Sequence, residues 1–92
     1  MTSPDKILLK LYVIKKSPGT QELVHNLKLF LDNGLRKEYM LEIIDILSNP
    51  ETAIQDKILA SPTLIKTEPY PPKRIVGKLA FSKLLEELEI SD

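Results

Sequence analysis

The junction Ser61-Pro62 restricts the folds open to this chain more than any other stretch, because it leads from a polar turn directly into the apolar run Thr63-Leu64-Ile65. Proline has no N–H group, so sheets accept it only at strand starts, edges and bulges. The X–Pro bond is also the one kind of peptide bond with an appreciable cis population. We therefore predict that a strand, Thr63 to Lys66, is entered at Pro62 through a constrained connection.

The residues up to Gly34 predict a strand followed by a helix. Lys6 to Ile14 is apolar at nearly every position, which is typical of a central strand covered on both faces. Ser17-Pro18 supplies a cap residue and a first-turn proline for a helix, and Asn33-Gly34 supplies its stop. Apolar residues recur along this helix at helical spacing and form one stripe: Leu23, Val24, Leu27, Phe30 and Leu31.

The same signals recur in the next segment. Tyr39 to Leu47 is again almost continuously apolar and predicts a second buried strand, parallel to the first. Asn49-Pro50 repeats the helix start, and the short helix that follows ends near Ile58. It is expected to bury Ala53, Ile54 and Ile58.

The chain after Pro62 predicts a hairpin and a last helix. Pro69-Tyr70-Pro71-Pro72 fits neither a helix interior nor a central strand, so it forms a stiff loop. Lys73 to Gly77 is short and β-like, and we expect it to form an antiparallel hairpin with the preceding strand at the edge of the sheet. Leu79 to Ile90 closes the chain as a helix with one apolar face, formed by Phe81, Leu84, Leu85 and Leu88.

Residues 1–92 are thus predicted to form one α/β domain with the order β-α-β-α-β-β-α. A mixed four-stranded sheet, covered by helices on both faces in this order, is the thioredoxin arrangement. In thioredoxin-like folds a cis-proline lies at a junction such as Ser61-Pro62, directly beside the active site. Pro62 is therefore the candidate for a structural cis-proline.

The residue types exclude the chemistry that usually accompanies this fold. The chain has no cysteine, which removes thiolate nucleophiles, disulfides and the usual zinc sites. The place of the reactive thiol holds Ser17 and Thr20, whose hydroxyls stay protonated at neutral pH. The one histidine, His25, has no serine, cysteine or acid placed by sequence to make it a catalytic base. We predict no enzyme, no metal and no cofactor.

Charge and hydropathy exclude further classes of protein. The 13 basic and 13 acidic residues give a formal net charge of zero, so no overall field attracts nucleic acid or an acidic membrane. The sequence contains neither a secretory signal nor an apolar run long enough for a membrane helix. We expect a cytoplasmic protein.

Basic residues gather around the predicted hairpin: Lys57, Lys66, Lys73 and Arg74. Tyr70 and several prolines lie between them, and an edge strand also offers unpaired N–H groups. Such a surface suits a partner-binding site. The alternative is that these charges only keep the edge strand soluble, and the residues by themselves favour neither.

Several blocks resemble the KaiB family, small thioredoxin-like proteins named for the cyanobacterial circadian clock. They are Leu9-Lys10-Leu11-Tyr12-Val13, Ile44-Asp45-Ile46-Leu47-Ser48-Asn49-Pro50 and Asp56-Lys57-Ile58-Leu59-Ala60-Ser61-Pro62-Thr63-Leu64. Lys73-Arg74-Ile75-Val76-Gly77 is similar to the family's basic strand, which ends in glycine. The resemblance extends from about Lys6 to Leu79.

The resemblance implies a non-enzymatic regulator that binds KaiC, a ring-shaped ATPase, and possible contact with a signalling histidine kinase. It implies a homo-oligomer, a dimer or tetramer, and an alternative tetrameric KaiB fold. Lys57, Lys66 and Arg74 are carried over as residues in contact with the partner, together with Lys73 from the cluster above. Charged contacts of this kind mainly set orientation and association rate.

Three alternatives remain at this point. A KaiB homologue outside a circadian clock would act in stress adaptation without binding KaiC. A sensor domain cut from a histidine kinase is disfavoured by the short reading frame, and a redox or glutathione-type enzyme is disfavoured by the missing cysteines.

Overall fold

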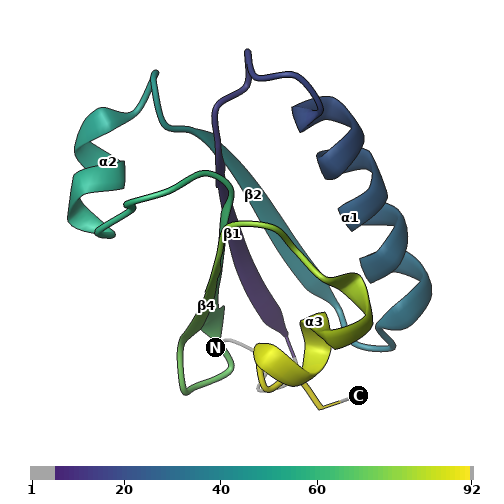
Figure 1. Cartoon of the computed structure of the whole chain (residues 1–92). Coiled ribbons are helices and arrows are strands. Elements are labelled where there is room, and N and C mark those ends of the chain that lie inside the picture. The colour runs from purple at the N-terminus through teal and green to yellow at the C-terminus, as the bar shows by residue number, and fades with distance from the viewer. Residues whose placement is uncertain (1–5, 92) are drawn as a thin grey trace.

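A computed structural model describes residues 6–91, and its elements follow the predicted order (Figure 1). The strands are β1 (Ile7–Val13), β2 (Tyr39–Asp45), β3 (Thr63–Glu68) and β4 (Lys73–Val76). The helices are α1 (Thr20–Gly34), α2 (Pro50–Gln55) and α3 (Phe81–Glu87). The predicted β-α-β-α-β-β-α arrangement is confirmed.

The four strands form one mixed sheet in the order β2-β1-β3-β4. β1 pairs with β2 in parallel and with β3 antiparallel, with a register shift between Leu8 and Leu9. β3 and β4 form the expected antiparallel hairpin at one edge of the sheet. The predictions of a central first strand, a parallel crossover and an edge hairpin are confirmed.

Helices cover both faces of the sheet, but unequally. α1 and α3 pack with one face of β1 in a large apolar core that includes Leu9, Leu11 and Leu84. α2 lies over the opposite face, as Figure 1 shows, and a much smaller core forms there from Tyr12, Ile44, Ala53 and Ile65. The predicted apolar stripes of α1 and α3 both belong to the larger core. α2 is thus held by few apolar contacts.

The start of α1 differs from the prediction. Ser17 is not the cap residue, because Gly19 takes a left-handed conformation with a φ of 84° and the helix begins only at Thr20. Glycine accepts this conformation without steric cost. The hydroxyl of Thr20 donates a hydrogen bond to the carbonyl oxygen of Ile14 (2.9 Å), which ties the turn to the end of β1.

Two predictions of burial are wrong. β2 is an edge strand rather than a buried one, and its Met40 and Glu42 are exposed because α2 covers only the other end of that face. Ile54 is 75% exposed, since the six-residue helix α2 meets the sheet through Ala53. None of the helices in residues 6–91 has the length and apolar character needed to span a bilayer.

Candidate functional site

The Ser61–Pro62 peptide bond is cis in the structure. It lies beside the turn that precedes α1, and the two segments line a cavity of about 250 Å³ together with Ser17, Gly19 and Leu23. As far as the described residues 6–91 show, the cavity walls carry hydroxyls and apolar groups but no thiol or titratable side chain. Nothing that lines this cavity could exchange a disulfide or attack a substrate as a thiolate.

Arg74 fastens β4 to the end of α2. Its guanidinium donates one hydrogen bond to the carbonyl oxygen of Asp56 (2.8 Å) and another to that of Lys57 (3.2 Å). The last carbonyls of a helix have no partner within the helix. A cation at this position donates hydrogen bonds to them and interacts favourably with the negative end of the helix dipole. Arg74 therefore has a structural role in addition to the predicted role in partner contact.

The carboxylate of Asp56 makes a second attachment of α2, which sequence reasoning missed. The hydroxyl of Tyr12 donates a short hydrogen bond to it, and the ammonium group of Lys10 lies 3.4 Å away. The Tyr12 hydrogen bond, followed by the charge of Lys10, holds the pKa of Asp56 below its usual value. Burial and the same hydrogen bond raise the pKa of Tyr12 far above that of a free tyrosine. The one available signal was a pair of polar residues, Lys10 and Tyr12, within the apolar run of β1.

Apolar and basic side chains are exposed on and next to α2. Leu59 is 94% exposed, and the side chain of Lys57 is exposed as well. Together with the exposed Ile54 and Arg74, they form what we call the α2 surface: Ile54, Lys57, Leu59 and Arg74. Lys57 has a positive φ of 56°, which turns the chain at the end of the helix.

The other two predicted basic residues lie on the opposite face of the sheet, toward α3. Lys73 forms an ion pair with Glu89, with 2.7 Å between ammonium and carboxylate. Lys66 is completely buried, and its amine has no hydrogen-bond partner in the described part of the chain. The prediction that Lys66 contacts a partner is at odds with this position. The structure therefore brings Lys57 and Arg74 together and separates them from Lys66 and Lys73.

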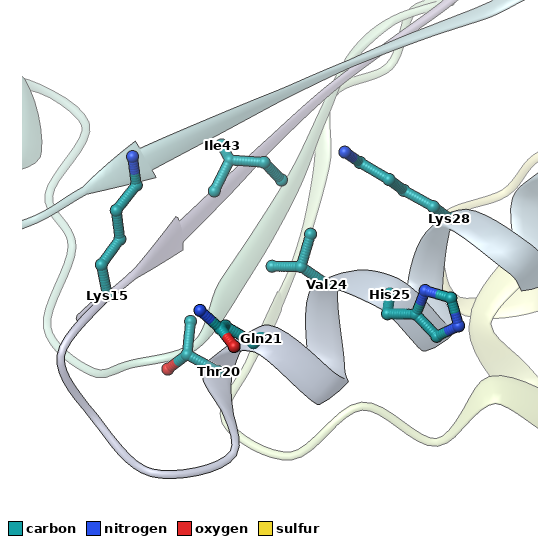
Figure 2. A pocket seen from close by; sticks show the side chains of 7 residues that line it. All are labelled: Lys15, Thr20, Gln21, Val24, His25, Lys28 and Ile43. Carbon is teal, nitrogen blue, oxygen red and sulfur yellow. The ribbon is translucent and has the colours of Figure 1, made fainter.

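A second surface feature, not anticipated from the sequence, is a groove between α1 and β2 (Figure 2). It has a volume of about 470 Å³. We call it the α1 groove, and its lining residues are Lys15, Thr20, Gln21, Val24, His25, Lys28 and Ile43. Within residues 6–91, no group of three or more His, Cys, Asp or Glu residues could hold a metal ion.

Comparison with known sequences gives one consistent family. The KaiB domain model matches residues 10–89. The circadian clock oscillator protein KaiB of Prochlorococcus marinus is 46% identical over 79 residues, which cover 85% of this chain and 66% of that protein. KaiB of a Synechococcus species is 44% identical over 79 residues, or 85% of this chain and 78% of that protein. This chain thus spans about two thirds to three quarters of these relatives.

Solved structures show the same fold at low sequence identity. The N-terminal domain of SasA from Synechococcus elongatus has a TM-score of 0.72 at 19% identity, over 97% of this chain and 82% of that one. Chloroplastic thioredoxin z has a TM-score of 0.71 at 18% identity, over 92% and 77% of the two chains. The thioredoxin-like fold predicted from the element order is confirmed.

Proposed function

The chain belongs to the KaiB family, and from this premise we propose that it is a clock-type regulator that acts by binding a KaiC-type ring ATPase through the α2 surface. The proposal includes a cytoplasmic location and self-association into a dimer or tetramer. A signalling histidine kinase is the proposed second partner. The protein is proposed to act by binding alone, without catalysing a reaction.

The observation that carries the proposal is the exposure of large apolar side chains on and just after α2, whose end is attached to the sheet by side-chain hydrogen bonds. Ile54 on α2 is 75% exposed, and Leu59, shortly after the helix, is 94% exposed. Lys57 and Arg74 supply basic groups beside them. Protein interfaces combine apolar side chains that become buried with polar groups around them, and this surface offers both kinds. The hydrogen bonds of Arg74 and Asp56 hold α2 in place, which lowers the entropy lost on binding.

The experiment measures binding to the KaiC-type ATPase encoded nearest to this protein, in ATP and in ADP. Leu59→Ser and Lys57→Glu each alter one exposed side chain of the α2 surface. We expect Leu59→Ser to weaken binding by about tenfold or more, because truncating a hot-spot side chain costs about 2 kcal/mol or more and tenfold corresponds to about 1.4 kcal/mol. Lys57→Glu mainly slows association.

Leu29→Ser is the matched control, because Leu29 is also a leucine with an exposed side chain but lies on α1. Unchanged affinity in both α2 variants would show that the partner binds elsewhere. No association in either nucleotide, with the protein folded, would favour the second candidate function, stress adaptation without KaiC binding.

A further inference from the structure

The α1 groove has the shape of a small-molecule site. Its volume of about 470 Å³ lies within the range of ligand pockets, roughly 300–1,000 Å³. Val24 and Ile43 form its apolar floor, and both pack against the large core beneath. The floor is therefore a fixed part of the fold, whereas the charged side chains around it stand at the rim.

The charges around this groove have one sign. Figure 2 shows Lys15 and Lys28 on either side of Ile43 and Val24, with the amide of Gln21 near Thr20. Among residues 6–91, no carboxylate lines the groove. Asp45 is the acid next to Lys15, and its oxygens already accept hydrogen bonds from the Lys15 amide (3.1 Å) and the Ser48 hydroxyl (2.8 Å). The charge of Lys15 also acts on Asp45. Even so, two lysines and no carboxylate of residues 6–91 line the groove of a chain with a formal net charge of zero, and this favours an anionic ligand.

We propose that the α1 groove binds a small organic phosphate with a flat apolar body. Lys15 and Lys28 supply positive charge on both sides of the groove for the charge of about −1.5 to −2 that a phosphate monoester carries near neutral pH. The body lies on Val24 and Ile43, which gives affinity that a bare anion cannot obtain. The amide of Gln21 donates a further hydrogen bond.

The test compares three probes by amide chemical shifts in the intact protein: phenyl phosphate, inorganic phosphate and phenol. We expect saturable shifts from phenyl phosphate, centred on Gln21, Val24, Lys28 and Ile43. Phenyl phosphate should bind about tenfold more tightly than inorganic phosphate, which lacks the apolar body, and than phenol, which lacks the charge.

Lys15→Gln and Lys28→Gln remove one rim charge each and keep a long polar side chain. Each should weaken phenyl phosphate binding by about three- to tenfold. Lys16→Gln and Lys83→Gln are matched controls, because both lysines are exposed and lie outside the groove. They should leave the affinity within about twofold.

Three results would overturn the proposal. They are no saturable shift from phenyl phosphate, equal affinity for phenyl and inorganic phosphate, or the same loss in all four lysine variants. The last two would reveal attraction by general surface charge. The experiment involves no ATPase, so its outcome is independent of the function proposed above.

Discussion

Replacing Lys66 by methionine should stabilise the protein. Lys66 is 0% exposed, and its amine has no hydrogen-bond partner within residues 6–91. Glu89 is the acid that acts on it, but its carboxylate is already paired with Lys73 at 2.7 Å. A buried polar group without a partner costs about 1–3 kcal/mol, and a charged one costs more. Methionine keeps an unbranched apolar chain in the same space and removes this cost.

We expect Lys66→Met to raise the free energy of unfolding at pH 7 by about 1–3 kcal/mol, measured by urea denaturation. For a domain of this size, each kcal/mol raises Tm by about 4–8 °C. The denaturant slope should stay constant, because the same surface is exposed on unfolding. Lys83→Met is the control, since Lys83 is exposed on α3 and its replacement by methionine has nearly the same helix propensity.

The pH dependence provides the sharper test. Burial lowers the pKa of Lys66, so the unfolded state binds the proton more tightly than the folded state. The wild type should therefore gain stability as the pH rises from the folded-state pKa toward 10.5, the ordinary lysine value. The advantage of Lys66→Met should shrink over that range. A variant that is no more stable than the wild type at pH 7, with a constant difference up to pH 10.5, would refute the reasoning.

Three further predictions concern the contacts that position the helices. Asp56→Asn should weaken the attachment of α2 by about 1–2 kcal/mol, measured as faster hydrogen exchange of the α2 amides. Because the folded state lowers the pKa of Asp56, the wild type should lose this stabilisation as the pH falls below 3.8. The hydrogen bond from the Tyr39 hydroxyl to Asp32, followed by burial, raises the pKa of Tyr39 to about 12. The stabilisation from this hydrogen bond should persist at pH 10 and be lost as the pH rises through 12. Asp32→Asn should lower the pKa of Tyr39, which ultraviolet titration measures. Phe30→Leu removes one of the stacked rings of Phe30 and Phe81, whose centroids lie 5.4 Å apart. A double-mutant cycle should give a coupling of about 0.5–1.5 kcal/mol, and no coupling would mean that the stacking itself contributes nothing.

Local patterns were sufficient to predict most of the fold. The continuous apolar run of β1 indicated a central strand, and the stripe of α1 indicated the face that packs on it. The hairpin followed from the proline-rich loop between β3 and β4. The errors at Ser17 and Ile54 came from single positions, where a glycine turn delayed the helix and a short helix left one flank exposed.

The candidate site was less predictable, because its contacts join distant parts of the chain. Lysine is seldom buried, so no sequence rule placed Lys66 beneath α3. Arg74 donates its hydrogen bonds to backbone carbonyls, which every residue has, so the sequence gives no sign of these contacts. Lys15 and Lys28 lie on either side of the α1 groove only because α1 runs back along β2. Such pairings depend on the tertiary fold rather than on local periodicity.

The ladder between β1 and β3 bears on how the protein is made. On the ribosome, β1, α1 and β2 are complete once residue 45 has emerged, whereas β3 begins only at residue 63. Until β3 arrives, one edge of β1 keeps its N–H and C=O groups unpaired beside an incomplete apolar core. On neighbouring ribosomes, the β3 of one nascent chain can therefore pair with the β1 of another. Slow elongation through residues 46–62 should increase the yield of such exchanged dimers.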